Sequence, residues 1–433
     1  MIKKKIAYVP LAVDILHKGH LNIIKIAKKY GVVVIGLLTD KAIAQYKDLT
    51  ILNYNERESL VKELAYVDKV IAQDSHDYEK ILNQIKPDYF IHGDDWKFDN
   101  RRYTRKKVIK ILKKWKGRLI EPKYTKNISS SLIKNKILEL SSPSNRVSTL
   151  KRSIVNKDIT RIIESHNALT GLIIENTFIN KNNKKIEFDG MWSSSLTDSA
   201  TKGLPDNSSL SFSSRISSLQ NMLDVTTKPV VFDADNGGQI EHLAFLVRSL
   251  ERSGVSAIIM EDKIGLKKNS LFNNQSGVRQ DKPTEFAKKI KKICRTRKSE
   301  DFMVIARIES FILGKGLNDA LRRAEIYSKA GADAIFIHSK EKTPKEIFAF
   351  AKAFKKSKFF KPLVAVPSTY SIVYEKELIK NGFKLVIYAN QLLRAAYPAM
   401  LNIAKMILHN NRSFEAEKKI IPIKELINLI KSN

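Results

Sequence analysis

The chain has 433 residues, of which 43% are hydrophobic and 28% charged, a composition typical of a globular protein with two or three domains. Its single cysteine, Cys294, excludes an intramolecular disulfide framework and suits a reducing compartment. No apolar run approaches the roughly 20 residues that span a bilayer, and the basic N-terminus lacks the apolar core of a signal peptide. We therefore expect a cytoplasmic protein with no membrane span.

The formal net charge is +32, from 77 Lys and Arg residues against 45 Asp and Glu residues. Such an excess is found in nucleic-acid-binding proteins. Here it is spread over both halves of the chain, and no zinc-finger spacing or aromatic-basic RNA-binding motif accompanies it. We interpret it as lysine-rich amino-acid usage combined with anionic substrates, and expect no nucleic acid partner.

Residues 1–140 alternate short apolar runs with amphipathic segments. Runs rich in β-branched residues predict strands, and apolar residues at helical spacing predict helices. The predicted strands lie at 6–11, 32–38, 69–72, 88–93 and 118–121, and the predicted helices at 20–30, 55–67, 78–85, 101–115 and 129–140. Regular strand–helix alternation implies a parallel sheet covered on both faces. The fold class is therefore α/β, with a Rossmann-like domain at the N-terminus.

Residues 141–155 are rich in serine, contain one proline and show no period, so they predict a linker. A second series of strands and helices follows. Its eight apolar runs predict strands at 160–165, 188–194, 229–235, 256–262, 302–307, 333–339, 362–368 and 384–390. Eight strand–helix units over about 250 residues predict a (β/α)8 barrel of the TIM type across 156–433. An appended amphipathic helix is expected within 409–433.

Polar residues stand at the carboxyl ends of the predicted barrel strands. Asp233 and Asp235 close the third strand, Glu261 the fourth, Arg307 the fifth and His338 the sixth. In such a barrel these ends form one mouth, where active sites are built. Three carboxylates at one point repel each other, and a hard divalent cation, magnesium above all, resolves the repulsion. Arg307 and His338 then supply groups that bind an anion such as phosphate.

The segment EDKIGLKKNS at 261–270 fits the EDKxxxKxNS motif of phosphoenolpyruvate mutases. The segments DGMWSSSLTDSATKG, DADNGG and VPSTY and the run 305–340 occur in the order of that family, so residues 160–425 resemble it. The resemblance implies that Asp233 binds magnesium directly. It further implies that Asp206, Asp235 and Glu261 hold the waters of the metal.

The same resemblance implies a loop that closes over the substrate. Lys267 and Asn269 are the implied catalytic residues of this loop, and Ser270 is an implied substrate-binding residue. Arg307 and His338 are implied to contact the transferred phosphoryl group. The residues implied to shape the pyruvyl pocket are Trp192, Ser194 and Leu196.

Related barrels offer two alternatives to a mutase. Isocitrate and methylisocitrate lyases carry a cysteine in the loop, whereas this chain has Lys267, Lys268 and Asn269 there, which disfavours a cysteine-dependent lyase. Phosphonopyruvate hydrolase is the closer alternative, and Asn269 favours the mutase over it. The expected reaction moves a phosphoryl group from oxygen to carbon within one substrate, which requires positioning, charge stabilisation and exclusion of water.

The segment His17-Lys18-Gly19-His20 follows the first predicted strand and opens a helix. Two histidines three residues apart at a helix N-terminus can both face a phosphate, assisted by free backbone amides. Gly19 lets the chain approach a nucleotide closely. Taken alone, the motif is equally compatible with incidental surface histidines.

The surroundings of this motif, including LLTDK, NERESLV, YVDKVI, HGDDWK and NISSSLIKNKI, resemble glycerol-3-phosphate-type cytidylyltransferases over residues 1–138. The resemblance implies CTP as a co-substrate, with His17 and His20 stabilising charge at its α-phosphate. The other implied nucleotide-binding residues are Lys47, Arg57, Asp94, Trp96, Ser129, Ser130 and Ser131. The phosphate-binding arginine that precedes the serine segment in that family is absent here, and Lys123 or Lys126 would substitute for it as a point charge. The identity of the molecule that accepts CMP is therefore left open.

The two resemblances imply a bifunctional enzyme of phosphonate biosynthesis. It would convert phosphoenolpyruvate to phosphonopyruvate and transfer CMP from CTP to a phosphonate, with 2-aminoethylphosphonate favoured. One alternative joins a hydrolase or carbon–carbon lyase barrel to a glycerol-3-phosphate or choline-phosphate cytidylyltransferase. Another is a basic nucleic-acid-binding protein that has lost catalysis, which the acidic cluster disfavours. Related barrels form dimers or tetramers, so we expect a homo-oligomer.

Overall fold

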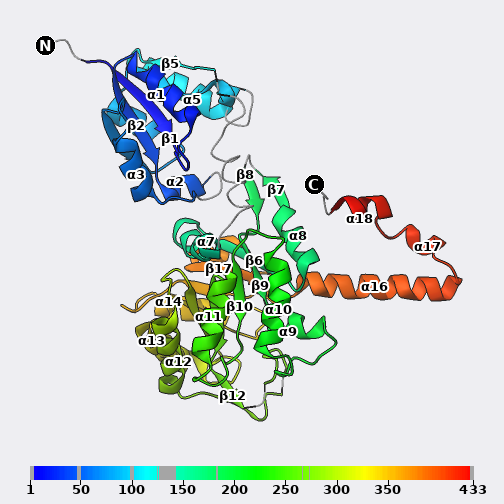
Figure 1. Cartoon of the computed structure of the whole chain (residues 1–433). Helices are drawn as coiled ribbons and strands as arrows, with labels where there is room; N and C mark the ends of the chain where they lie inside the picture. Colours follow the sequence, from blue (N-terminus) through cyan, green and yellow to red (C-terminus); the bar gives the residue numbers. More distant parts are fainter. Residues whose placement is uncertain are drawn as a thin grey trace.

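The computed structural model describes residues 4–45, 50–97, 102–123, 125, 143–181, 184–265, 267–272 and 274–429 (Figure 1). The N-terminal part is a five-stranded, all-parallel sheet of order β3-β2-β1-β4-β5. Its strands are β1 (Ile6–Leu11), β2 (Val32–Leu38), β3 (Lys69–Gln73), β4 (Tyr89–Ile91) and β5 (Arg118–Ile120). Its helices are α1 (Lys18–Lys28), α2 (Asp40–Ala44), α3 (Tyr54–Lys62), α4 (Glu79–Ile85), the 3-10 turn η1 (Asp94–Lys97) and α5 (Arg102–Lys113).

The predicted parallel α/β sheet of the N-terminal part is confirmed. Strand β2 is buried along its length after Val32, as expected for a continuous apolar run with helices on both sides of the sheet. The predicted helix at 129–140 lies outside the described residues.

The C-terminal part is a closed barrel of eight parallel strands, as predicted. The strands, in order around the barrel, are β6 (Thr160–Glu164), β9 (Gly190–Ser193), β10 (Val230–Asp233), β11 (Ala257–Glu261), β14 (Met303–Ile308), β15 (Ala334–Ile337), β16 (Leu363–Ala365) and β17 (Phe383–Tyr388). The intervening helices are α8 (Ala168–Asn176), α9 (Ser195–Ala200), α10 (Phe212–Leu223), α11 (Leu243–Ser253), α12 (Pro283–Thr296), α13 (Gly316–Ala330), α14 (Lys345–Phe354) and α15 (Glu375–Lys380).

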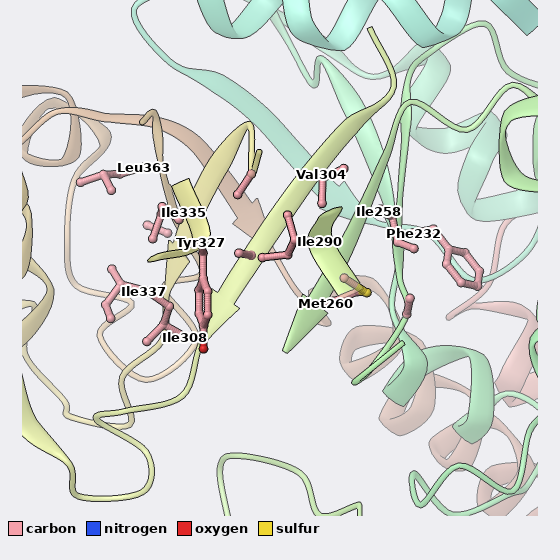
Figure 2. Packing of buried hydrophobic residues seen from close by; sticks show 14 of the residues in the cluster. Phe232, Ile258, Met260, Ile290, Val304, Ile308, Tyr327, Ile335, Ile337 and Leu363 are labelled. Atoms are coloured by element: carbon pink, nitrogen blue, oxygen red, sulfur yellow. The ribbon is translucent and has the colours of Figure 1, made fainter. Parts of the chain in front are cut away.

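Successive residues of each barrel strand point alternately into the barrel and out toward the helices. Figure 2 shows the outer layer, in which Ile258 and Val304 pack beside the helical residues Ile290 and Tyr327. Their strand neighbours belong to a separate inner cluster, which includes Ile259, Ile305 and Phe336. The barrel interior is therefore a packed core, and polar residues are left to the rim.

The prediction that residues 141–155 form an aperiodic linker is wrong for 143–155. These residues belong to helix α7 (Pro143–Asn156), which buries Val147, Leu150 and Ile154. Arg146 ties the helix to the barrel by donating to the carbonyl oxygens of Leu223 (3.0 Å) and Thr226 (2.5 Å). Val147, Leu150 and Ile154 have the helical spacing i, i+3 and i+7 in the sequence. They form only one narrow apolar stripe among serines, and the sequence analysis therefore missed the helix.

Two short antiparallel pairs extend from the barrel: β7 (Phe178–Lys181) with β8 (Lys184–Glu187), and β12 (Lys263–Gly265) with β13 (Val278–Gln280). The last barrel strand is followed by the long helix α16 (Gln391–Asn410), then α17 (Phe414–Glu417) and α18 (Ile423–Leu429). These three form an arm that runs away from the barrel in Figure 1. The amphipathic helix expected within 409–433 is present as α18. Within the described ranges, no helix is long and apolar enough to cross a membrane.

Candidate functional site

The strand ends bring the predicted barrel residues to one pocket. Trp192 comes from β9, Asp233 from β10, Glu261 from β11 and Arg307 from β14, while His338 directly follows β15. Other predicted residues that line the same pocket are Ser194, Leu196, Asp206, Asp235, Lys267, Asn269 and Ser270. Every barrel residue predicted for the site therefore borders one cavity.

One wall of the pocket is acidic. Asp235 adopts the left-handed conformation, with φ of 51°, and its amide donates to Asp233 Oδ1 at 3.1 Å. Burial, together with repulsion from Asp233, raises the pKa of Asp235. Burial likewise raises the pKa of Glu261 to about 7, against the opposing effect of nearby Arg307. Burial is thus the main cause of both raised pKa values.

A buried arginine that the sequence analysis missed supports this wall. Arg215 on α10 donates from Nε to Asp198 Oδ2 at 2.8 Å and from Nη1 to the Asp233 carbonyl oxygen at 2.5 Å. Its Nη1 lies 3.9 Å from an Asp235 carboxylate oxygen. Arg215 therefore fixes the chain beneath the acids and places a positive charge close to Asp235.

Strands β12 and β13 form a hairpin beside the pocket, and the described residues that follow β12, 267–272 and 274–280, are called the lid below; Lys267, Lys268, Asn269, Ser270 and Leu271 of the lid line the pocket. Gly265 shapes the lid, because it has φ of +93° and a Cβ there would lie 2.5 Å from the Gly277 carbonyl oxygen. Asn269 in the lid donates from Nδ2 to Asp206 Oδ2 at 3.2 Å. The lid thus contacts the acidic wall directly.

Lys267 reaches from the lid into the acids. Its Nζ lies 2.5 Å from Asp206 Oδ1 and 2.7 Å from Asp235 Oδ1. Burial alone would lower the pKa of Lys267, but Asp235 and the other aspartates raise it, so the ammonium stays charged. No three His, Cys, Asp or Glu side chains in the described part of the chain are arranged to hold a metal ion. The ammonium of Lys267 instead bridges Asp206 and Asp235, two of the acids predicted to bind the metal or its waters. The carboxylate oxygens of these acids are donors of the kind that a hard cation prefers.

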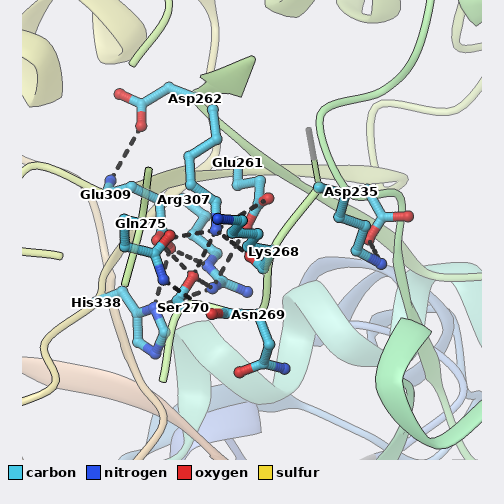
Figure 3. A network of polar contacts seen from close by, with 12 residues as sticks. Asp235, Glu261, Asp262, Lys268, Asn269, Ser270, Gln275, Arg307, Glu309 and His338 are labelled. Carbon is cyan, nitrogen blue, oxygen red and sulfur yellow. Dashed lines mark hydrogen bonds and ion pairs between the residues drawn. The ribbon is translucent and has the colours of Figure 1, made fainter. Parts of the chain in front are cut away.

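The opposite wall carries fixed positive charge (Figure 3). Arg307 donates from Nε to Glu309 Oε1 at 2.5 Å, and His338 Nδ1 lies 2.9 Å from the same oxygen. Lys263 donates to Ser270 Oγ at 2.7 Å. Glu309 and Lys263 were not among the predicted site residues, although Glu309 stands only two positions after Arg307. This wall can bind an anionic group, and it meets the acidic wall at Glu261, which lies 3.4 Å from Arg307 Nη2 and 3.5 Å from Lys263 Nζ.

Trp192 is 5% exposed and borders the pocket between the two walls. Its Nε1 is buried and has no hydrogen-bond partner among the described residues. A buried donor without an acceptor is costly, so this indole N–H suits a ligand oxygen.

In the N-terminal part, His17 and His20 lie at the start of α1 with their rings stacked at 3.9 Å between centroids. The Gly19 amide donates to His17 Nδ1 at 3.1 Å, so the ring proton of neutral His17 is on Nε2. Burial lowers the pKa of His17 and favours this neutral form. The pair can therefore offer ring N–H groups to an anion at the helix N-terminus.

Two residues predicted to bind nucleotide are fully buried. Arg57 donates to the carbonyl oxygens of Ala12 and Leu38 and to Asp40. Trp96 donates from Nε1 to Glu121 at 2.7 Å. Both side chains are thus occupied by partners within the protein, and their contact with a nucleotide stays a prediction.

The remaining nucleotide-site predictions are only partly covered by the structure. Asp94 opens η1 and is half-buried. His92, which the sequence analysis missed, stacks on Trp96 at 3.9 Å between ring centroids and lies nearer the surface. The predicted residues Lys47, Ser129, Ser130 and Ser131 lie outside the described residues.

Comparison with known proteins matches both parts of the chain. A family model for phosphoenolpyruvate phosphomutase matches residues 150–408, and a cytidylyltransferase-like model matches 13–136. The phosphoenolpyruvate phosphomutase of Tetrahymena pyriformis is 36% identical over 300 residues, covering 69% of this chain and 95% of that protein. The phosphonopyruvate hydrolase of Variovorax sp. (strain Pal2) is 34% identical over 278 residues, covering 63% of this chain and 94% of that protein.

Two solved structures resemble the barrel. The phosphoenolpyruvate phosphomutase from Streptomyces platensis subsp. rosaceus aligns with a TM-score of 0.60 and 34% identity, covering 65% of this chain and 94% of that one. A phosphonopyruvate hydrolase in complex with oxalate and Mg²⁺ aligns with a TM-score of 0.58 and 31% identity, covering 66% of this chain and 94% of that one.

The barrel with its lidded, charged mouth and the separate parallel-sheet domain define a two-domain α/β enzyme. The chain belongs to the phosphoenolpyruvate phosphomutase family and carries an N-terminal cytidylyltransferase-like domain.

Replacing Lys267 tests whether it holds the lid closed in the metal-free protein. In Lys267→Met the lid loses its ion pairs with Asp206 and Asp235, so we expect chymotrypsin to cleave after exposed Phe272 at least about 5-fold faster. Lys268→Met is the matched control, because among the described residues Lys268 Nζ bonds to Ser276, which is on the lid itself. Equal cleavage rates for the two variants would contradict this role.

Proposed function

We propose that the barrel interconverts phosphoenolpyruvate and phosphonopyruvate, and that the N-terminal domain transfers CMP from CTP to a phosphonate. The observation that carries the first part is the pairing of an acidic wall with an anion-binding wall beneath a lid that contacts both. A phosphoryl group bound at Arg307 and His338 would lie opposite a pyruvyl group at the acids. Such an arrangement suits transfer between oxygen and carbon of one bound molecule.

The proposed roles follow from where each group lies. Arg307 and His338 hold the phosphoryl group, and the charge of Arg307 stabilises it as it leaves one atom for the other. Trp192 Nε1 donates to the pyruvyl group. Asn269 and Lys267 close the lid, which excludes water that would otherwise capture the phosphoryl group. Asn269 favours the mutase over the hydrolase.

We further propose that magnesium binds at the acids, with Asp233 as a direct ligand. Asp206, Asp235 and Glu261 would hold its waters. Lys267 Nζ lies 2.7 Å from Asp235 Oδ1, so the acids already accept one cationic group. The hydrolase relative was solved with Mg²⁺ at 31% identity. Bound there, the ion would stabilise the negative charge of a pyruvate enolate.

An assay with phosphonopyruvate and Mg²⁺ tests the proposed reaction. We expect phosphoenolpyruvate as the main product, loss of activity with EDTA, and a fall in kcat of at least about 100-fold in Asp233→Asn. Asp224→Asn, an exposed acid at the end of α10, is the control and should retain activity. Pyruvate and phosphate as the main products would instead assign the hydrolase.

The N-terminal proposal rests on His17 and His20 at the start of α1, with CTP as the nucleotide. Both belong to the part matched by the cytidylyltransferase-like model. The favoured acceptor is 2-aminoethylphosphonate, because phosphonopyruvate made by the barrel is a phosphonate precursor. Glycerol 3-phosphate and choline phosphate are the alternative acceptors.

Pyrophosphate release from CTP, measured with each acceptor, tests this proposal. We expect turnover with 2-aminoethylphosphonate and a fall of about 100-fold or more in His17→Ala, because a donor to the phosphates is lost. His242→Ala, an exposed histidine of the barrel, should leave the rate unchanged. Turnover only with a phosphate ester would reject the phosphonate as acceptor.

We also propose that the protein is a cytoplasmic homo-oligomer. Helix α16 has 20 residues, none of them buried. Its Tyr397, Met400 and Leu408 are 65%, 62% and 78% exposed, and Ile423 and Ile427 of α18 are 70% and 66% exposed. So large an apolar surface is unfavourable in water. A second copy of the chain would cover the arm.

Charge placed on the arm should weaken this assembly. We expect Leu408→Glu to shift the mass measured by light scattering after gel filtration from a dimer or tetramer toward one chain. Lys405→Glu, on the exposed surface of the same helix, is the control and should leave the mass unchanged. A wild-type protein with the mass of one chain would contradict the proposal.

A further inference from the structure

Glu309 is a fully buried carboxylate that directly follows β14, and it connects parts of the site that come from distant segments. Its amide donates to Asp262 Oδ1 at 3.0 Å, which fixes the backbone at this position. Its two carboxylate oxygens face different partners. Oε1 accepts from Arg307 Nε and lies 2.9 Å from His338 Nδ1, and Oε2 accepts from Ser270 of the lid.

The Oε1 contacts set the direction of the phosphoryl-binding pair. Arg307 Nε is 2.5 Å and His338 Nδ1 is 2.9 Å from Oε1. Burial alone would raise the pKa of Glu309, but Arg307 and His338 hold it well below its usual range, so the carboxylate is ionised. Within the described part of the chain nothing hydrogen-bonds to Arg307 Nη1 or His338 Nε2. These are the atoms left for a ligand.

The Oε2 contact belongs to the lid. Ser270 Oγ donates to Oε2 at 2.6 Å and accepts from Lys263 Nζ at 2.7 Å and Arg307 Nη2 at 2.9 Å. One hydroxyl therefore has three partners, and all three lie at the fixed wall of the pocket. When the lid lifts, Ser270 leaves, and both Glu309 and Arg307 lose a partner at the same time.

We propose that Glu309 is a positioning residue that latches the lid through Ser270 and, with the same carboxylate, orients Arg307 and His338. Lid closure and organisation of the phosphoryl-binding pair are then a single event. This inference rests on the proposed mutase function and assigns Ser270 a role in closure. A weak latch would admit water while the phosphoryl group is in transfer.

The latch makes a specific prediction about side products. In an opened site, a water oxygen forms a new bond to phosphorus as the carbon–phosphorus bond of phosphonopyruvate breaks. The enolate carbon then takes up a proton, which gives pyruvate and phosphate. A variant that only distorts the fold would lower both products together, whereas a loosened latch raises the fraction of phosphate.

The test compares Ser270→Ala, Glu309→Gln and the double variant, with phosphonopyruvate as substrate and both products measured. We expect each single variant to lower phosphoenolpyruvate formation by about 10-fold or more and to raise the phosphate fraction several-fold. Because both act through one contact, the double variant should be about as slow as the slower single variant. Ser270→Thr, which keeps a hydroxyl, should restore part of the rate.

Ser276→Ala is the matched control, since Ser276 lies on the exposed part of the lid and should not change the product ratio. Thermal unfolding of each variant checks its fold, and Ser270→Ala alone suffices if Glu309→Gln does not fold. Multiplicative losses with an unchanged product ratio would overturn the latch. A wild-type enzyme that forms only pyruvate and phosphate would overturn the mutase assignment instead.

Discussion

Acidic side chains packed into a buried pocket must be balanced by cations, and the mouth of the barrel is organised by this constraint. Parallel strands bring their carboxyl ends to one rim, which places Asp233 and Glu261 close together. The balancing charges come from other elements. Arg215 reaches the rim from helix α10, which lies outside the ring of strands, and Lys267 reaches it from the lid. The acids, the helix and the lid therefore depend on one another.

The two walls meet this constraint in different ways. On the acidic wall, the ammonium of Lys267 is carried by the lid, and its partners within the described part of the chain are carboxylates, so another cation can replace it. On the opposite wall, Arg307 is buried and bonded to Glu309, and Lys263 is buried within 3.6 Å of the carboxylates of Glu261 and Glu309. The positive charge of Arg307, which would bind an anion, is thus part of the pocket wall at all times. The positive charge of Lys267, which stabilises the ionised acids, can be replaced by another cation. This difference allows lid movement and cation binding to influence each other.

Alternating strands and helices predicted both folds, and polar residues at strand ends predicted Asp233, Asp235, Glu261, Arg307 and His338. Asp206 and the lid residues Lys267, Asn269 and Ser270 were implied only by the family resemblance. Glu309 was missed although its spacing from Arg307 was visible in the sequence. Arg215 lies in a serine-rich helix, where nothing in the pattern distinguishes a buried guanidinium from an exposed one. For Arg57 and Trp96 the motif was recognised but the burial was not, because burial depends on packing between elements distant in sequence. Helix α7 was missed because serines hid its apolar stripe.

The two proposed sites would treat phosphate groups by different physical means. Neutral His17 can donate a hydrogen bond but adds no full charge, so lysines and the N-terminus of α1 must balance the charge of a nucleotide. In the barrel, Arg307 brings a full charge in a planar group whose direction is fixed by Glu309. A rearrangement within one small molecule depends on the orientation of the phosphoryl group, which a rigid guanidinium provides. Transfer to a separate acceptor depends more on stabilising the negative charge of the leaving pyrophosphate. Lysine side chains can do this, because each carries a point charge on a flexible stem.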